Sequence, residues 1–168
     1  MTDIYALLAE LGISYDRYDH APVMTCEEAD AAVPERDAAH TKNLFLRDKR
    51  GRRHLLVVTT CAKSVDLKRL AAQMDADNLS FASPERMAKY LGVSPGAVTI
   101  LGLANDVEHS VELIVDADVW NAATWRAHPL VNSATLVLKK PDIVKFLSHT
   151  GHAPRVVAIE DRGVTGNP

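Results

Sequence analysis

The chain has 168 residues, of which 47% are hydrophobic and 24% charged, and its formal net charge is -3. These values are typical of a globular protein with one domain over residues 1–168, and they argue against a disordered chain. No apolar run approaches the roughly 20 residues that a membrane-spanning helix needs, and the first residues lack the basic start of a secretory signal, so we expect a cytoplasmic protein without a membrane partner.

The charges are unevenly distributed along the chain. Residues 1–40 hold nine acidic and two basic residues, whereas residues 41–168 hold 13 acidic and 17 basic ones. Six of the twelve residues from Lys42 to Arg53 are lysine or arginine. This cluster could contact phosphates at one end of a nucleic acid, or it could only keep a hairpin turn soluble. The acidic net charge and the lack of a recognition helix argue against a protein that binds duplex DNA.

Hydrophobic periodicity, caps and turn residues predict helices intermixed with strands. In chain order we expect a helix over 2–12, an edge strand over 14–19, a helix over 25–33, a hairpin with strands at 44–46 and 54–60, a helix over 64–74, a short strand over 79–81, a helix over 83–91, strands over 98–101 and 110–115, an irregular helix over 116–125, a strand over 134–138, a helix over 141–150 and a strand over 155–159. The tail over 160–168 should fray. Because no regular strand-helix-strand repeat occurs, this order predicts an α+β fold with a mixed sheet.

Local capping signals delimit two of these helices clearly. Thr25 and Glu28 match a capping box. Ser83 and Pro84 begin a helix that Gly92 ends, because proline fits the first turn and glycine fits the position just past the last one.

Lys42 and Asn43 lie at the entrance of the hairpin. A strand end can hold a polar side chain rigidly beside a pocket without burying a charge in the core. The alternative is that Lys42 is an ordinary solvated lysine and Asn43 a turn residue.

The segment from Gly92 to Gly96 predicts a loop before an apolar strand. Its glycines bring no side chain, so exposed backbone groups of Gly92, Val93, Ser94, Pro95 and Gly96 could approach a ligand closely. The alternative is a simple helix stop followed by a turn.

His128 is the candidate base among seven scattered histidines. It lies at a strand entrance, followed by Pro129 and by the amide of Asn132, although an isolated histidine is more often a structural or surface residue than a base. The chain has no Gly-x-Ser-x-Gly elbow, Walker loop, dinucleotide fingerprint or His-Glu-x-x-His motif, so the corresponding enzyme classes lose their main support.

The two cysteines, Cys26 and Cys61, form no Cys-x-x-Cys pair and have no spaced histidine pair beside them. This pattern argues against a disulfide scaffold or a zinc site and favours chemistry without a cofactor. We expect each cysteine to be a small packing residue rather than a nucleophile.

Several segments together resemble the YbaK/prolyl-tRNA-synthetase-associated domain family, whose members hydrolyse wrongly charged aminoacyl-tRNA. The segments that carry the resemblance are His20-Ala21-Pro22-Val23, Glu27-Glu28-Ala29, Thr41-Lys42-Asn43-Leu44-Phe45-Leu46, Asp66-Leu67-Lys68, Leu91-Gly92-Val93-Ser94-Pro95-Gly96-Ala97-Val98, Gly102-Leu103-Ala104-Asn105-Asp106 and His128-Pro129-Leu130-Val131-Asn132. They stand in the family's order over about residues 15–138. The Lys-Asn-Leu-Phe-Leu and His-Pro-Leu-x-Asn forms are most similar to the free-standing branch that removes alanine from proline's tRNA.

The resemblance implies a mostly antiparallel central sheet surrounded by helices and a deacylase that acts on the acceptor end of mischarged proline tRNA, with transient association with prolyl-tRNA synthetase. Lys42 would orient the terminal ribose or phosphate or polarise the ester, and Asn43 would hold the substrate. The backbone from Gly92 to Gly96 and the amide of Asn132 would bind the aminoacyl group or the oxyanion. His128 would shape the pocket or place the water.

Two departures from the family pattern concern the amino-acid pocket. The segment from Thr60 to Val65 stands where the family has glycine, and Ile100 stands where proline is common. If both line the pocket, the substrate could be another mischarged amino acid such as cysteine. A further alternative is a binding module of the same fold that recognises charged tRNA or RNA without cleaving it.

Overall fold

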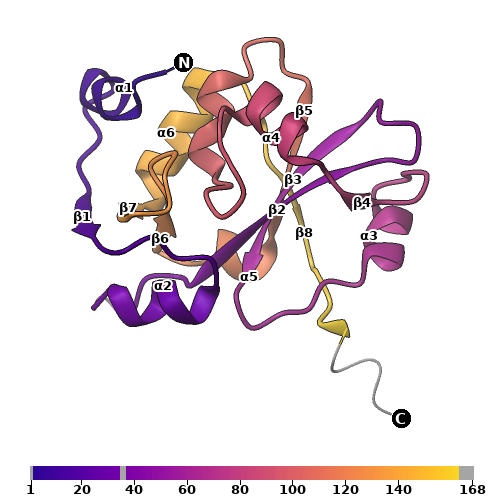
Figure 1. Ribbon diagram of the computed structural model, residues 1–168, viewed down its shortest axis with the longest axis horizontal. Coiled ribbons are helices and arrows are strands. Elements are labelled where there is room, and N and C mark those ends of the chain that lie inside the picture. The colour runs from indigo at the N-terminus through magenta and orange to yellow at the C-terminus, as the bar shows by residue number, and fades with distance from the viewer. Residues whose placement is uncertain (1, 35–36, 163–168) are drawn as a thin grey trace.

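The computed structural model describes residues 2–34 and 37–162 (Figure 1). The helices in this part are α1 Ile4–Glu10, α2 Cys26–Ala32, α3 Leu67–Gln73, α4 Pro84–Leu91, the 3₁₀ helix η1 Ile100–Asn105, α5 Ala117–Trp120 and α6 Lys140–Thr150. The strands are β1 Asp16–Asp19, β2 Thr41–Arg47, β3 His54–Thr60, β4 Ser80–Phe81, β5 Val111–Asp116, β6 Thr124–Ala127, β7 Ala134–Lys139 and β8 Arg155–Val157. Among the residues described, no helix is both long and apolar enough to cross a bilayer.

The strands form two sheets. A three-stranded antiparallel sheet has the order β1-β7-β6, and a five-stranded sheet has the order β4-β2-β3-β5-β8. In the larger sheet, β2 pairs antiparallel with β3 and β4, whereas the pairs β3–β5 and β5–β8 are parallel. The predicted α+β class with a mixed sheet is confirmed. The strands divide between two sheets rather than forming one central sheet, because β7 pairs with β1 and β6 and not with a strand of the larger sheet.

The hydrophobic core lies on both faces of β3, which explains the unbroken apolar run in that strand. Successive side chains of a strand point to opposite faces. Leu56 and Val58 pack in the larger core cluster, which includes residues of the smaller sheet and of α6. Leu55 and Val57 pack in a second cluster with residues of α3. A strand covered on both faces reads as continuously hydrophobic.

The capping signals in the sequence form the expected contacts. The Thr25 hydroxyl accepts a hydrogen bond from the backbone N–H of Glu28 at 3.2 Å, and Ser83 caps α4 by accepting from the N–H of Arg86 at 3.3 Å. Gly92 ends α4 in the left-handed conformation with φ +66°. These short-range contacts explain why the bounds of α2 and α4 were predicted closely.

Three segments differ from their predictions. The strand expected over 98–101 is instead the start of η1, because Thr99 accepts from the N–H of Leu101 and caps a 3₁₀ turn. The irregular helix expected over 116–125 is the short α5 followed by β6, which pairs with β7. The helix expected from residue 64 begins after Asp66, which caps α3. In the tail expected to fray, residues 163–168 lie outside the described residues.

Candidate functional site

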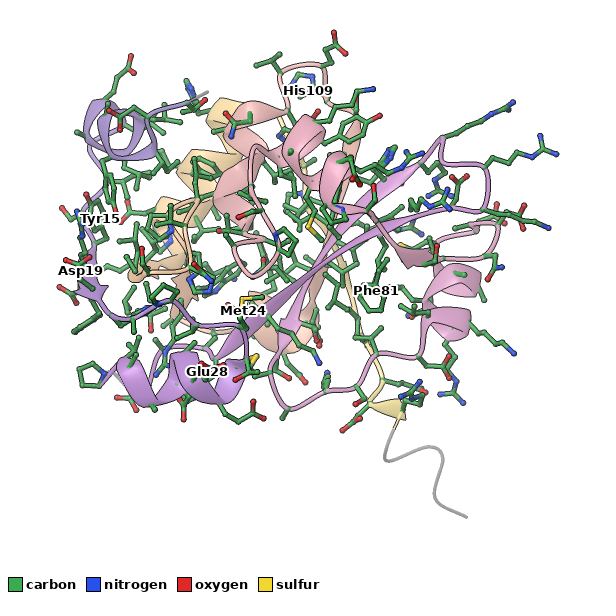
Figure 2. The ribbon with its side chains drawn as sticks, in the orientation of Figure 1. Tyr15, Asp19, Met24, Glu28, Phe81 and His109 are labelled. Atoms are coloured by element: carbon green, nitrogen blue, oxygen red, sulfur yellow. A yellow bond between two sulfur atoms is a disulfide. The ribbon has the colours of Figure 1, made fainter. Side chains whose placement is uncertain are left out.

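A pocket of about 270 Å³ opens between β2 of the larger sheet and β6 of the smaller one. Its walls also include α2 with the residues before it, the loop at 95–98, and Phe81 of β4. Lys42, Asn43, Gly96 and His128 all line this pocket. Three segments that lie far apart in the sequence and were predicted to meet at one site therefore do so. Figure 2 shows Met24 and Phe81 on either side of β2.

The ammonium group of Lys42 is held at one end of the pocket. Its Nζ donates a hydrogen bond to the backbone carbonyl of Lys63. Burial lowers the pKa of Lys42, while the carboxylates of Asp161 and Glu27 oppose that shift. Lys42 is thus a partly desolvated cation rather than the freely solvated lysine of the alternative interpretation.

The side chain of Lys63 is held by three contacts, which restrict the position of the backbone carbonyl that Lys42 contacts. Its Nζ contacts Asp116 Oδ2 at 2.8 Å, Asp118 Oδ2 at 2.8 Å and the carbonyl of Ile159 at 2.7 Å. Burial disfavours its charge, but the hydrogen bonds to Asp116 and Asp118 outweigh this effect and raise the pKa of Lys63. Asp116 is almost fully buried, so this lysine is the counter-charge that makes its burial tolerable.

Asn43 presents a side-chain oxygen that is buried and, within the described residues, forms no hydrogen bond. A buried acceptor without a partner costs about 1–3 kcal/mol. A ligand that donates a hydrogen bond to Asn43 Oδ1 would remove this cost. Because Asn43 lines the pocket, a turn of its side chain would present this oxygen to a ligand with a donor group, such as an amine or a hydroxyl.

His128 offers the pocket an acceptor. Its Nδ1 lies 2.9 Å from the carbonyl oxygen of Ala134, which can only accept, so we assign the proton to Nδ1 and the lone pair to Nε2. Burial lowers the pKa of His128 from its ordinary value of 6.5, and the nearby His20 adds to that effect, although the hydrogen bond to Ala134 opposes it. The ring is therefore neutral at neutral pH.

Gly96 brings the loop at 95–98 against the wall formed by the residues before α2. It has φ +89°, and a Cβ at this position would lie 2.7 Å from Met24 Sδ and 3.1 Å from Asn132 Nδ2. Asn132 Nδ2 also donates to the carbonyl of Val23 at 2.8 Å. Asn132 is not among the pocket-lining residues, so the structure gives it a role in holding the wall rather than direct contact with a ligand.

Only part of the predicted glycine loop reaches the pocket. Pro95 and Gly96 line it, whereas Gly92, Val93 and Ser94 do not. Gly92 is the C-cap of α4, and Val93 is only 4% exposed because it packs in the core.

The two departures from the family pattern also lie mostly outside the pocket. Ile100 is 2% exposed in the core, and of the segment from Thr60 to Val65 only Cys61 lines the pocket. The expectation that Ile100 shapes the amino-acid pocket was therefore wrong, because this residue packs into the core at the start of η1.

An ion cluster that the sequence did not reveal attaches α2 to the smaller sheet. Asp30 Oδ1 lies 2.8 Å from His40 Nδ1 and 3.1 Å from Arg126 Nη1, and all three residues line the pocket. The guanidinium of Arg126 is nearly buried, so Asp30 neutralises a charge that would otherwise be costly there. No spacing rule connects residues this far apart, so the sequence predicted the helix but not this cluster.

The prediction that the cysteines are separate packing residues was wrong. Cys26 and Cys61 form a disulfide with a Cα–Cα distance of 5.8 Å across a sequence separation of 35. The first residue of α2 and the residue after β3 meet only in the tertiary structure, which sequence spacing does not reveal. The bond links two walls of the pocket, because both cysteines line it.

No group of three or more His, Cys, Asp or Glu side chains within residues 2–34 and 37–162 is arranged to hold a metal ion. The residues of the pocket instead supply a cation, an amide oxygen, a neutral imidazole and backbone groups.

Comparisons with known proteins identify the family of the chain. A sequence model described as an aminoacyl-tRNA editing domain matches residues 20–146. The chain is 38% identical over 156 residues to the prolyl-tRNA editing protein ProX of Acetoanaerobium sticklandii, covering 93% of this chain and 95% of the relative. It is 32% identical over 160 residues to a prolyl-tRNA synthetase associated domain-containing protein 1 of Danio rerio, covering 94% of this chain and 86% of the relative.

Solved structures share the fold. A protein described as a candidate trans-editing enzyme for prolyl tRNA synthetase superposes with a TM-score of 0.71 at 16% identity, and the match covers 95% of each chain. At this level of identity the likeness concerns the fold alone. Because the family's sequence model covers most of the chain and a curated relative matches nearly all of it, the protein belongs to the aminoacyl-tRNA editing domain family.

Proposed function

We propose that the protein hydrolyses the ester of mischarged tRNA in trans and that its substrate is alanine on proline tRNA. The observation that carries this proposal is the pocket that brings Lys42, Asn43, Gly96 and His128 together. An aminoacyl ester is already activated, so its hydrolysis needs a positioned water and a stabilised oxyanion more than a strong nucleophile. These four residues supply such an environment.

Lys42 stabilises the negative charge that develops during hydrolysis. Its partial burial makes the cation more effective than a solvated lysine, because electrostatic interactions are stronger where water is excluded. Its contact with the carbonyl of Lys63 fixes the ammonium while leaving donor capacity for the ester or the terminal ribose. The backbone of Gly96 lines the same pocket and can approach the acyl group closely.

Asn43 and His128 hold the substrate and the water. The unpaired Asn43 Oδ1 accepts a hydrogen bond from the α-ammonium of the amino acid or from a ribose hydroxyl. The Nε2 lone pair of His128 accepts one from the attacking water. A hydroxyl of the terminal adenosine assists proton transfer, which accounts for hydrolysis without a catalytic triad.

Selection of alanine over proline is steric in this proposal. A pocket that admits a methyl side chain clashes with a pyrrolidine ring, and such a clash discriminates more sharply than a large pocket that rejects a smaller ligand. The loop and the wall before α2 lie close together, because a Cβ added at Gly96 would lie 2.7 Å from Met24 Sδ, and this limits the space for a side chain.

The basic hairpin tip contacts phosphates of the acceptor stem. Lys49, Arg50 and Arg52 are exposed at the tip, whereas Arg53 is engaged by Glu112 at 2.8 Å. The tip lies about 20 Å from the pocket end of β2, judged from the rise of a seven-residue strand. The affinity for tRNA should therefore fall as the salt concentration rises.

We also propose a cytoplasmic location and transient association with prolyl-tRNA synthetase, which charges the same tRNA.

The substrate is tested by mixing the purified protein with alanine-, cysteine- and serine-charged proline tRNA and with correctly charged prolyl-tRNA. Release of alanine alone supports the proposal, and selective release of cysteine or serine would name another substrate. If every charged tRNA stays bound and intact, the protein is a binding module of the same fold.

The role of Lys42 is tested with Lys42→Ala. Removal of one oxyanion-stabilising donor should lower kcat about 100-fold or more with little change in Tm. Lys68→Ala is the matched control, because Lys68 is an exposed lysine on α3 outside the pocket. Equal activity of Lys42→Ala and Lys68→Ala would remove Lys42 from the mechanism.

A further inference from the structure

We propose that Phe81 and Leu44 form a platform on which the adenine base of the terminal tRNA nucleotide stacks. The proposal rests on the function proposed above and adds a subsite for the nucleoside. Both residues line the pocket, on β4 and β2 respectively.

The pairing of β2 with β4 places this platform in line with Lys42. Phe81 lies directly opposite Leu46 in the antiparallel ladder, so their side chains share one face of the sheet. Leu44 and Lys42 are two and four residues before Leu46, and the two-residue period of a strand places them on that face as well. Lys42, Leu44 and Phe81 therefore form a row about 13 Å long at strand spacing.

Asn43 points to the opposite face of β2, because successive side chains alternate. Side chains from both faces of β2 therefore line the pocket. On one side, Asn43 shares the pocket with His128 and Gly96, which suit the aminoacyl group. On the other side, the row from Lys42 to Phe81 leads away from the ester and suits the nucleoside that carries it.

The exposure of Phe81 is the second observation. Its side chain is 62% exposed although it is a large aromatic residue. The other exposed large hydrophobic residues within the described part of the chain are aliphatic: Met24, Val107, Val131, Val144 and Val156. Phe81, labelled in Figure 2, belongs to β4, which pairs with β2. An exposed aromatic ring next to a binding pocket is the feature that a nucleobase uses for stacking.

The chemistry of the row selects a nucleoside over a peptide or a lipid. The cation of Lys42 at one end matches the phosphate or the ester, partly buried Leu44 matches the ribose ring, and the aromatic face matches the base. Leu46, which lies opposite Phe81, is fully buried within the second core cluster. The base therefore has access to the Phe81 ring but not to Leu46.

A binding experiment tests the platform independently of catalysis. Adenosine 5′-monophosphate is titrated into protein carrying labelled phenylalanine rings, and the ring signals are followed by NMR. We expect the Phe81 signal to shift on titration and Phe81→Ala to weaken binding about 10-fold or more, since stacking on one aromatic residue has an effect of this size. The platform is refuted if the nucleotide leaves the Phe81 ring unshifted or if Phe81→Ala binds it as tightly as the unchanged protein.

Kinetics with charged tRNA provide the second test. Phe81→Ala should raise KM about 10-fold or more and leave kcat nearly unchanged, whereas Phe81→Trp should restore KM because it keeps an aromatic face. Val107→Ala is the control, because Val107 is 79% exposed and lies outside the pocket.

Saturating concentrations of charged tRNA separate stacking from damage to the site. At saturation Phe81→Ala should deacylate the tRNA at nearly the rate of the unchanged protein, and a loss of kcat as large as the loss of kcat/KM would overturn the proposal. If the unchanged protein deacylates no charged tRNA, the proposed function fails, and the nucleotide titration still decides the platform.

Discussion

Breaking the Cys26–Cys61 disulfide should destabilise the protein by about 4 kcal/mol. The cysteines are 35 residues apart, and the chain-entropy treatment of a loop of this length gives about 4 kcal/mol. In a chain of this size, such a loss lowers Tm by about 10 °C. The loss should be felt most in α2, because no residue of that helix is buried and its remaining attachment includes the contacts of Asp30 with His40 and Arg126.

Thermal unfolding of three samples measures this effect: the oxidised protein, the protein reduced by a dithiol, and the double variant Cys26→Ser/Cys61→Ser. The reductant should lower Tm of the first protein and leave the double variant unchanged, and amide exchange should speed up in α2. If the oxidised protein and the double variant share the same Tm and the same exchange rates, the reasoning is refuted. Disulfides are rare in the cytoplasm, where thiols are kept reduced. If the protein is cytoplasmic, as proposed, the double variant therefore stands for the reduced form that predominates there.

Three further predictions concern the pocket and its supports. Gly96→Ala should lower deacylation and should lower the free energy of unfolding more than Gly12→Ala does. Both glycines have a positive φ, +89° and +69°, but a methyl group at 96 would lie 2.7 Å from Met24 Sδ, whereas one at 12 would have nothing within 4 Å. Equal losses of stability in the two variants would contradict this reasoning. Because burial lowers the pKa of His128 below 6.5, the neutral ring should persist at neutral pH, and kcat/KM should fall only as the pH drops below 6.5. His128→Asn should lack this acid limb, and a limb unchanged in the variant would assign it to another group. Lys63→Met should lower the free energy of unfolding by about 3 kcal/mol in urea titrations, because it leaves the carboxylate of Asp116 buried without its cation. Adding Asp116→Asn should recover much of that loss, and no recovery would show that the pair is not the cause.

Short-range signals in the sequence predicted much of the fold. The capping box at Thr25 and the glycine stop at Gly92 involve partners a few residues apart, so the pattern contains the whole interaction. The strand ending at Thr60 was predicted because it contains the apolar run from Leu55 to Val58 followed by two β-branched threonines. The run over 98–101 was not, because a few apolar residues fit a buried strand and a 3₁₀ turn equally well.

Site residues were predicted from the sequence where a polar side chain lies near the end of a strand, as at Lys42, Asn43 and His128. Asp30 and Arg126 are 96 residues apart, and their ion pair depends on how α2 docks against β6. The partnership of the cysteines depends on the same docking, and the exposure of Phe81 depends on the short β4 pairing at the edge of β2. None of these leaves a local pattern.

The anchoring of Lys63 bears on how short a working version of this protein can be. The carbonyl of Ile159 holds the Lys63 side chain, and the carbonyl of Lys63 in turn receives the ammonium of Lys42. The stretch recognised by the family's sequence model, residues 20–146, stops before Ile159. A fragment trimmed to that stretch would retain all the residues that line the pocket but would lose one of the three contacts that hold the ammonium of Lys63. The support of Lys42 therefore extends beyond the residues that the family's sequence model matches.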